Sequence, residues 1–330
     1  MNKIEQKRNP PTRRVKVAVL YGGISFEHEV SLMSAESVMA NLDDSLFEVV
    51  PIMISKEGKF ELKSLLSSDV IFPVLHGIGG EDGSIQGFCE ILQKPCVGSG
   101  IEASALALDK IASKQIFENL KLPIPHFEFF EKLEWQENPS KIMRKIRLPA
   151  FIKPANTGSS IGISKVKRKS QLKRAVKKAL KYDDRIIVEE ALANIREIEI
   201  SVLGNVDLII SLPGEIIPSE DFYTYKAKYQ SDSRLIIPAE ISNRKIREIQ
   251  NLAAKAYRAL GCQGFARVDF FLSARGGSAF GRERPEGKVY INEINTIPGF
   301  TEISMFPKLI EASGIKYKDL LTKLVRMAFK

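Results

Sequence analysis

The feature that most limits the fold of this chain is a repeated order of short apolar run, glycine turn and amphipathic stretch. Residues 15–20 (VKVAVL) form the first run, the turn "YGG" follows, and "SAESVMANL" then has helical periodicity. Residues 49–54 and 70–77 are further strand candidates, and the second ends in the glycine loop "HGIGGEDGS" before the helical "IQGFCEILQ". Because strands that alternate with helices form mostly parallel sheets, we expect an α/β domain over residues 15–108.

Two further units are expected, over residues 109–190 and 191–330. In the first, "DKIASKQIFENL" is helical and stops before the prolines of "KLPIPHF", and the strand "PAFIKPA" leads into the turn "NTGSSIG". The amphipathic helix "SQLKRAVKKALKYDD" and the strand "RIIVEEAL" follow. The last unit contains several apolar strands and the long helix "RKIREIQNLAAKAYRAL", so the C-terminal half is expected to be α+β.

The net charge of +9 raises the question of nucleic-acid binding. Residues 1–16 carry six basic and one acidic residue, a net +5, and residues 275–288 carry four basic and two acidic residues, a net +2. The rest of the chain is therefore nearly neutral, which argues against a nucleic-acid surface. We expect residues 1–14 to be a disordered basic tail.

The chain also lacks the marks of a membrane or secreted protein. No apolar run approaches the ~20 residues that span a bilayer, and the N-terminus lacks the apolar core of a signal peptide. Cys89, Cys96 and Cys262 show no metal or disulfide spacing. We therefore expect a cytoplasmic protein that makes no membrane contact.

Two C-terminal strands carry the clearest chemistry. "ARVDFFL" places Arg267 and Asp269 on one face of a strand, and "KVYINEIN" places Glu293 and Asn295 on one face of the next. If the strands pair as an antiparallel hairpin, Asp269, Glu293 and Asn295 converge into an oxygen site that suits Mg²⁺ bridging substrate phosphates. Because a buried, uncompensated carboxylate is costly, a metal or Arg267 should lie beside them. From the spacing alone, the alternative that these three residues share one face of the sheet by chance stays open.

Residues 151–162 offer a phosphate site, although the motifs GxxxxGK[ST] and GxGxxG are absent. In "FIKPANTGSSIG", Lys153 lies on a strand and the glycine–serine turn presents N–H groups and hydroxyls to an anion. Lys110 opens the preceding helix, and Glu189 and Glu190 end an apolar strand where they could hold a ribose or an adenine amine. Taken singly, each of these residues is equally well explained as a surface residue.

Together the motifs resemble those of a known family. "GGISFEHEVS", "HGIGGEDGSIQG", "ALDKIASK", "FIKPANTGSSIGISKV", "REIEISVLGN", "FYTYKAKYQSDS", "ARVDFF" and "NEINTIPGFTEISMFP" stand in the order and at about the spacing of D-alanine–D-alanine ligases, which are ATP-grasp enzymes. The resemblance covers roughly residues 15–327. It implies an N-terminal Rossmann-like pre-ATP-grasp domain and two ATP-grasp subdomains that hold a nucleotide between them.

The resemblance also implies a reaction and its cofactors. ATP phosphorylates the carboxylate of one D-alanine, and the amine of a second D-alanine attacks the acyl phosphate, giving the dipeptide used in peptidoglycan synthesis, ADP and phosphate. The expected cofactors are ATP and Mg²⁺ or Mn²⁺, with two ions, and family members are often homodimers.

The resemblance assigns roles to particular residues. At the amino-acid sites it implies Glu27 for the ammonium of the first D-alanine, His76 beside it, Ser160 to orient Glu27, Arg267 and Gly299 for the oxyanion, and Ser304 and Met305 for the carboxylate of the second D-alanine. At the nucleotide site it implies Lys110 and Lys153 for phosphates, Ser159 and Ser160 in a loop over the γ-phosphate, Glu190, Ala191 and Leu192 around adenine, Glu197 for the ribose, Lys228 and Tyr229 in a shielding loop, and Asp269, Glu293 and Asn295 for metal.

Four alternatives stay open at this point. A D-alanine–D-lactate or D-alanine–D-serine ligase of the same family is the nearest, although Tyr229 matches the dipeptide-forming type. Another ATP-grasp ligase would share the metal strand but not "GGISFEHEVS" or "KAKY". A regulatory protein without activity should have lost some of Arg267, Asp269, Glu293 and Asn295, and all four are present. An RNA-binding module is disfavoured by the local origin of the charge.

Overall fold

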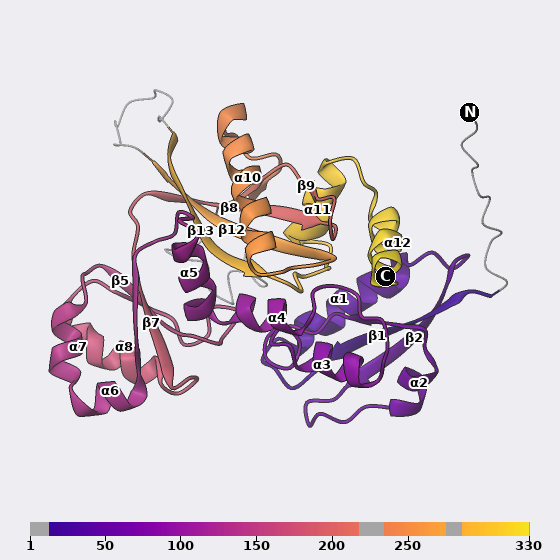
Figure 1. Ribbon diagram of the computed structural model, residues 1–330, viewed down its shortest axis with the longest axis horizontal. Coiled ribbons are helices and arrows are strands. Elements are labelled where there is room, and N and C mark those ends of the chain that lie inside the picture. Colours follow the sequence, from indigo (N-terminus) through magenta and orange to yellow (C-terminus); the bar gives the residue numbers. More distant parts are fainter. Residues whose placement is uncertain (1–12, 218–233, 275–285, 330) are drawn as a thin grey trace.

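The computed structural model describes residues 13–217, 234–274 and 286–329, and it contains three β-sheets (Figure 1). The N-terminal and central sheets lie at opposite ends of the molecule, and the C-terminal sheet lies above the junction between them (Figure 1). The strands of the three sheets lie within residues 15–73, 127–190 and 195–295. Lys228 and Tyr229, and most of the loop 274–287, fall outside the described residues.

The N-terminal unit is built on a parallel sheet, as the alternation of strands and helices predicts. β1 lies between β2 and β3 and runs parallel to both. Val17 and Val19 pack toward α1, and Ala18 and Leu20 pack toward α3, so helices bury both faces of the sheet. The elements are β1 (Val15–Gly22), α1 (His28–Asn41), β2 (Phe47–Ile54), α2 (Leu62–Ser67), β3 (Val70–Pro73), α3 (Ser84–Ile91) and α4 (Ile101–Leu108).

The central unit is an antiparallel sheet of order β4-β7-β5-β6. The predicted amphipathic helix is confirmed as α8, whose apolar residues Leu172, Ala175 and Val176 pack on Ala150 and Ile152 of β5. Its basic residues lie on the opposite, exposed face. The elements are α5 (Lys110–Asn119), β4 (Phe127–Glu131), α6 (Lys132–Glu137), α7 (Pro139–Lys145), β5 (Ala150–Pro154), β6 (Ser164–Val166), the 3₁₀ turn η1 (Lys169–Gln171), α8 (Leu172–Ala179) and β7 (Arg185–Glu190).

The C-terminal unit is an antiparallel sheet of order β11-β10-β8-β12-β13, with β9 beside β8. The long predicted helix is confirmed as α10, which buries Ile249, Ala253 and Tyr257 against this sheet and ends before Gly261. The elements are β8 (Ile195–Leu203), β9 (Ile209–Ile210), β10 (Gly214–Ile217), β11 (Arg234–Ile236), α10 (Asn243–Ala259), β12 (Phe265–Ala274), β13 (Glu286–Asn295), α11 (Met305–Ala312) and α12 (Tyr317–Ala328).

The last helix returns to the N-terminal unit. Leu320, Leu321 and Leu324 of α12 join the same apolar cluster as Val17 and Phe72 of the parallel sheet. The rings of Phe265, Phe300 and Phe306, with centroids 5.3–5.5 Å apart, extend this cluster into the C-terminal sheet. The N-terminal and C-terminal units therefore share one apolar core, which fixes the loop at residues 296–304 between them.

Two predictions need correction. Arg13 and Arg14 were expected to belong to a disordered tail, but Arg13 pairs with both carboxylate oxygens of Asp69 at 3.0 and 2.8 Å, and Arg14 donates to the Asp44 carbonyl at 3.1 Å. The strand expected over residues 70–77 ends at Pro73, because the chain turns into the glycine loop. Within the described residues, no helix is long and apolar enough to cross a bilayer.

Candidate active site

The pairing of β12 with its two neighbours builds the centre of the site. β12 and β13 form the predicted antiparallel pair, with Asp269 opposite Glu293 and Arg267 opposite Asn295. On its other side, β12 pairs with β8 so that Asp269 also lies opposite Glu199. Three carboxylates on neighbouring strands therefore lie in one row across the sheet, and like charges in such a row repel unless a cation compensates them.

Arg267 supplies that cation, as the sequence predicts. Its Nε and Nη2 donate to both oxygens of Asp269 at 2.7 and 2.8 Å, and its Nε lies 3.0 Å from Glu199 Oε2. Burial alone would lower the pKa of Arg267, but the charges of Asp269 and Glu199 outweigh burial and raise it well above its ordinary value. The guanidinium is therefore a permanent charge in a partly enclosed site.

The donors expected to bind a metal suit Mg²⁺, with most of the coordination left to substrate and water. Asp269 and Glu293 lie side by side on paired strands, and Asn295 Oδ1 accepts from the Ile297 N–H at 3.0 Å. Among the described residues, no group of three His, Cys, Asp or Glu side chains is arranged to hold a metal alone. Two carboxylates and one amide oxygen fit an ion that takes few protein ligands and bridges phosphates.

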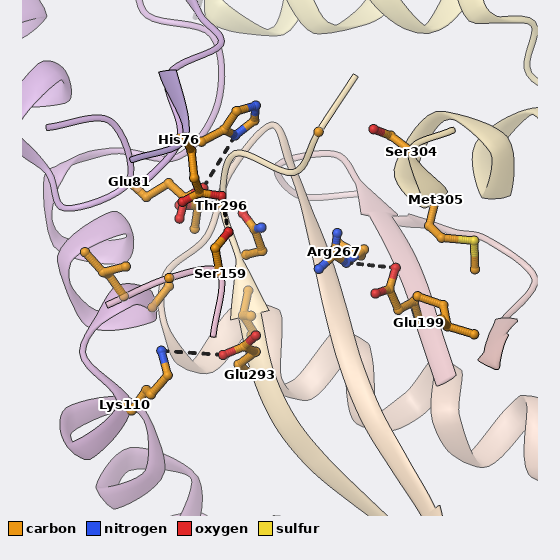
Figure 2. A pocket seen from close by; sticks show the side chains of 18 of the residues that line it. His76, Glu81, Lys110, Ser159, Glu199, Arg267, Glu293, Thr296, Ser304 and Met305 are labelled. Carbon is orange, nitrogen blue, oxygen red and sulfur yellow. Dashed lines mark hydrogen bonds and ion pairs between the residues drawn. The ribbon is translucent and has the colours of Figure 1, made fainter. Parts of the chain in front are cut away.

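A small cavity of about 100 Å³, hereafter the small cavity, opens on this centre. His76 and Ser304 lie on opposite sides of it and Arg267 lies between them (Figure 2). The His76 ring contacts the Ile297 carbonyl at 3.1 Å through Nδ1 and Ser34 Oγ at 3.2 Å through Nε2. The lining of the small cavity includes residues predicted for the amino-acid sites, namely Glu27, His76, Arg267, Gly299, Ser304 and Met305. It also includes Asn295, which is predicted for the metal.

Glu27 is held at the edge of the small cavity by the loop that follows β5. The hydroxyl of Ser159 donates to Glu27 Oε1, whereas the sequence assigned this contact to Ser160. Ser159 and Ser160 both have positive φ, 49° and 60°, in the left-handed region that residues other than glycine rarely adopt. A Cβ on Gly158 would lie 3.2 Å from Glu27 Oε2, so the glycine permits this close approach.

The far side of the small cavity is the start of α11. Ser304 is the N-cap of this helix, and its Oγ accepts from the Thr301 N–H at 3.0 Å. A Cβ on Gly299 would lie 2.6 Å from Ser304 Oγ, so only glycine fits there. Ser304 and Met305 thus place a hydroxyl and a helix N-terminus beside the cavity, where an anionic group is favoured.

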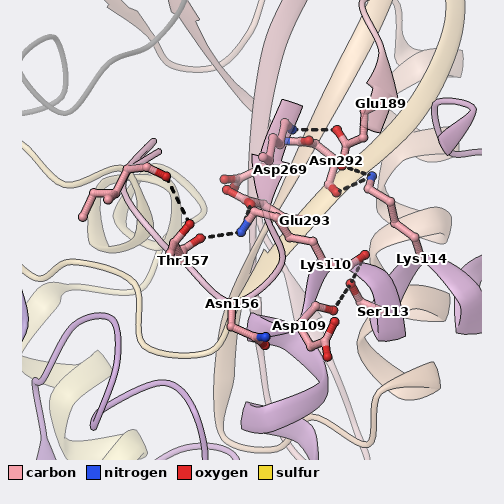
Figure 3. A network of polar contacts seen from close by, with 12 residues as sticks. Asp109, Lys110, Ser113, Lys114, Asn156, Thr157, Glu189, Asp269, Asn292 and Glu293 are labelled. Atoms are coloured by element: carbon pink, nitrogen blue, oxygen red, sulfur yellow. Dashed lines mark hydrogen bonds and ion pairs between the residues drawn. The ribbon is translucent and has the colours of Figure 1, made fainter. Parts of the chain in front are cut away.

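A second, larger hollow, the large cleft, lies between the central and C-terminal sheets and measures about 440 Å³. Its volume is that of a small-molecule site. Lys153 Nζ lies 2.6 Å from Glu189 Oε2, and Lys110 Nζ donates to the Thr157 carbonyl at 2.7 Å and lies 3.6 Å from Glu293 (Figure 3). The predicted nucleotide residues Lys110, Lys153, Ser159, Ser160, Glu190, Leu192 and Glu197, with Asp269 and Glu293, line it.

Ala191 is the exception among these residues. It lines a neighbouring cavity behind the sheet, and its N–H donates to the Pro149 carbonyl at 3.0 Å. The reason is that the β5–β7 pairing runs to Ala150 and Glu190, and Pro149 directly precedes β5, so the next amide continues the ladder by one hydrogen bond. This N–H is therefore already bonded within the protein, and contact of the backbone at Ala191 and Leu192 with the adenine edge stays a prediction.

The small cavity and the large cleft share one wall. Residues common to both linings include Lys110, Gly158, Ser159, Glu199 and Glu293. A group bound in the large cleft and a group bound in the small cavity therefore meet beside two cations, Lys110 and Arg267, and the metal donors. This arrangement suits transfer of an anionic group from one ligand to the other.

Several residues of the site escaped the sequence reasoning. Glu81 lies 3.7 Å from His76 Nδ1, Glu199 pairs with Arg267, and Lys114 contacts Glu189 at 3.4 Å. Glu199 follows Glu197 by two residues on the same strand face, which is a usable signal. Lys114 lies on a short helix among polar residues, where nothing in the sequence distinguishes it from a solvent-exposed lysine.

Comparisons with known proteins show which family the chain resembles. A family model described as "D-ala D-ala ligase C-terminus" matches residues 116–326, and one described as "D-ala D-ala ligase N-terminus" matches residues 16–68 and 61–99.

The chain belongs to the D-alanine–D-alanine ligase family.

Relatives of this ligase family cover nearly the whole chain. D-alanine--D-alanine ligase B of Clostridium tetani is 42% identical over 96% of this chain and 94% of its own length. The D-alanine--D-alanine ligase of Caldicellulosiruptor bescii is 42% identical over 96% of both chains.

Solved structures of ligases have the same fold. The VanG D-Ala:D-Ser ligase from Enterococcus faecalis superposes with a TM-score of 0.83 at 33% identity, covering 96% of this chain and all of the other (100%). The D-alanine-D-alanine ligase from Coxiella burnetii gives a TM-score of 0.82 at 32% identity, covering 96% and 94%. The ATP-grasp architecture expected from the sequence is thereby confirmed.

Proposed function

We propose that this chain joins two D-alanine molecules into D-alanyl-D-alanine at the expense of ATP, with peptidoglycan synthesis as its role. The observation that carries the proposal is the wall shared by the large cleft and the small cavity, lined by Lys110, Glu293 and Ser159. Curated relatives at 42% identity, which bear the name D-alanine--D-alanine ligase, support it.

ATP occupies the large cleft in this proposal. Lys110 and Lys153 bind its phosphates as point charges, and the N–H groups and hydroxyls of Ser159 and Ser160 enclose the terminal phosphate. Glu197 holds the ribose, and Glu190 and Leu192 lie at the adenine. Asp269, Glu293 and Asn295 would hold Mg²⁺ or Mn²⁺, as two ions, which would neutralise phosphate charge when bound.

The first D-alanine occupies the small cavity. Glu27 accepts from its ammonium and His76 lies beside it, so the carboxylate points toward Arg267 and the shared wall. That carboxylate attacks the terminal phosphorus of ATP, ADP leaves, and a D-alanyl phosphate forms. Arg267 and the backbone of Gly299 stabilise the negative charge that develops on the carbonyl oxygen in the next step.

The second D-alanine binds at the start of α11, with its carboxylate on Ser304 and the helix N-terminus at Met305. Its neutral amine attacks the acyl carbon, the bond from carbon to the phosphate oxygen breaks, and phosphate leaves as the peptide bond forms. Holding both amino acids beside one phosphate replaces two encounters in water by a single oriented complex.

Three further parts of the proposal rest on the family alone. Lys228 and Tyr229 shield the acyl phosphate from water, which would otherwise hydrolyse it. The enzyme works in the cytoplasm as a homodimer. It needs no nucleic acid and no membrane.

Phosphate release tests the proposal. Purified protein with ATP, Mg²⁺ and D-alanine should release one phosphate per dipeptide formed, and L-alanine in place of D-alanine should give neither product. Release of phosphate without dipeptide, or equal rates with the two enantiomers, would overturn the proposed function.

A D-alanine–D-serine ligase is the alternative that an observation favours, because the VanG D-Ala:D-Ser ligase has the same fold over 96% of this chain. The two functions differ only in what the second site accepts. Equimolar D-alanine with D-serine, and with D-lactate, near neutral pH separates them. We expect D-alanyl-D-alanine to dominate, and a dominant mixed product would reassign the chain.

A further inference from the structure

Helix α5 brings a second lysine to the edge of the large cleft. Lys114 lies one helical turn after Lys110, and it is 1% exposed, which is unusual for a lysine. Its Nζ donates to the carbonyl oxygen of Asn292 on β13 at 3.1 Å and lies 3.4 Å from Glu189 Oε1 on β7 (Figure 3). One ammonium therefore links the C-terminal sheet to the central sheet.

Glu189 has a second cationic partner. Its Oε2 lies 2.6 Å from Nζ of Lys153, the lysine proposed to bind phosphate, and Glu189 itself is only 2% exposed. Burial alone would raise the pKa of Glu189, but the charges of Lys114 and Lys153 outweigh burial and lower it. The glutamate is therefore an ionised carboxylate shared by two ammonium groups.

This sharing matters when a nucleotide arrives. Lys153 has to turn from Glu189 toward a phosphate oxygen, and a carboxylate as buried as Glu189 cannot be left without a cation except at a large cost. Lys114 stays in place because the Asn292 carbonyl and the body of α5 hold it. With Lys114 present, Glu189 stays compensated after Lys153 has moved.

We propose that Lys114 is a positioning residue that serves as the standing counter-ion of Glu189 and thereby leaves Lys153 available to nucleotide phosphates. The proposal rests on the proposed function, in that the large cleft must bind a nucleotide. Lys114 itself does not contact the ligand. In the described part of the chain, the carboxylate of Glu189 forms ion pairs with Lys114 and Lys153 alone. Without Lys114, Lys153 therefore stays paired with Glu189.

The test compares two ligands that differ only in their phosphates. ADP and adenosine are titrated calorimetrically into the wild-type protein and the variant Lys114→Met, which keeps the length of the side chain and removes its charge. We expect ADP to bind about tenfold more weakly to the variant, a typical coupling between contacting residues, and adenosine to bind as before. A variant whose fold is merely destabilised would lose affinity for ADP and for adenosine alike.

Two further variants sharpen the test. Lys245→Met removes another buried lysine, paired with Glu248 on α10 outside the cleft, and should leave both affinities unchanged. In the background of Glu189→Gln, Lys114→Met should no longer weaken ADP binding, because the charge that Lys114 compensates is gone. This double variant removes both charges of the Lys114–Glu189 pair, and the remaining cation, Lys153, faces the large cleft, so the double variant gives a measurement if Lys114→Met alone folds poorly.

The outcomes separate the role proposed for Lys114 from the proposed function of the chain. Unchanged ADP affinity in Lys114→Met, an equal loss for ADP and adenosine, or a full effect in the Glu189→Gln background would each overturn the role of Lys114 alone. A wild-type protein that binds neither ADP nor adenosine would overturn the proposed function and this role with it.

Discussion

The large cleft and the small cavity differ in what builds them. The large cleft lies between two sheets, and its charged residues Lys153, Glu189 and Asp269 are carried by strands. The small cavity measures about 100 Å³ against about 440 Å³, and loops from all three units form much of its wall. Its contacts depend on close approaches, such as Gly299 against Ser304.

The difference shows how the two sites should respond to change. Charged residues on strands are held by the hydrogen bonds of the sheet, so single substitutions in the large cleft should change the affinity for ligand gradually. In the small cavity, an added methyl group or a lost hydrogen bond displaces a ligand with little room to adjust. Substitutions in the small cavity should therefore reduce binding or activity more strongly. In the large cleft, the effect of a substitution should increase with the burial of the residue that is replaced.

The largest expected effect is that of Arg267→Lys, at the wall of the small cavity. A lysine keeps the charge but cannot donate to Asp269 and Glu199 at once while also facing the oxyanion. We expect kcat to fall by about 100-fold to 1000-fold, as for loss of one oxyanion donor. Steady-state kinetics with a thermal melt measures this, and a native-like melt with full activity would remove the oxyanion assignment.

Gly158→Ala should come next. Its added methyl group would meet Glu27 Oε2 at 3.2 Å, so the carboxylate expected to hold the first ammonium is displaced. We expect the KM for the first D-alanine to rise about tenfold. Gly100→Ala is the matched control, because nothing lies within 4 Å of the added group and the residue is the N-cap that precedes α4. Equal KM values in both variants would contradict the crowding argument.

The pH dependence of stability should show a smaller effect, through His76. Burial alone lowers the pKa of His76, but its contact with Glu81 and the charges of Glu27 and Glu81 outweigh burial and raise it above 6.5. The folded state then holds the proton to higher pH than the unfolded chain. This stabilisation is therefore complete below pH 6.5 and is lost as pH rises through the folded pKa.

The variant His76→Gln measures this contribution. Chemical unfolding at several pH values should show that the difference in free energy of unfolding between wild type and variant shrinks as pH rises above about 6.5, by about 1.4 kcal/mol per unit of pKa shift. A difference that is flat with pH, or that grows toward alkaline pH, would mean that His76 folds as the neutral imidazole.

The smallest expected effect belongs to the mouth of the large cleft. Glu190 follows Glu189 on β7 but is exposed, so water screens its charge. Glu190→Gln should change the affinity for ADP by less than about threefold. Glu189→Gln, one residue earlier, should change it more. If calorimetry shows a larger change in ADP affinity for Glu190→Gln than for Glu189→Gln, burial does not determine the size of the effects in the large cleft.

Local sequence pattern was enough to predict much of the fold and the centre of the site. Alternating runs predict the parallel sheet around β1, and the two-residue spacing of Arg267 with Asp269 and of Glu293 with Asn295 predicts the paired strands. These features depend on periodicity within one segment or between neighbours in sequence. The resemblance to a ligase family, carried by eight ordered motifs, is confirmed by the family models.

What the sequence missed depends on contacts between distant segments. The return of α12 to the N-terminal core joins residues near 320 with residues near 17, and no local pattern encodes that pairing. The contact of Ser159 with Glu27 joins the loop after β5 to a residue 132 positions earlier in the chain. Lys114 becomes a buried cation only because Glu189 of β7 and Asn292 of β13, both distant in sequence, contact it.

The transfer of carboxylate oxygen to phosphate tests the central claim most directly, namely that a group on ATP in the large cleft reaches the carboxylate of an amino acid in the small cavity. D-alanine labelled with ¹⁸O in its carboxylate is supplied with ATP and Mg²⁺, and the released phosphate is analysed by mass spectrometry. An acyl phosphate intermediate predicts one ¹⁸O atom in each phosphate released. Unlabelled phosphate accompanying dipeptide would contradict the account, because no bond between carboxylate and phosphorus would have formed.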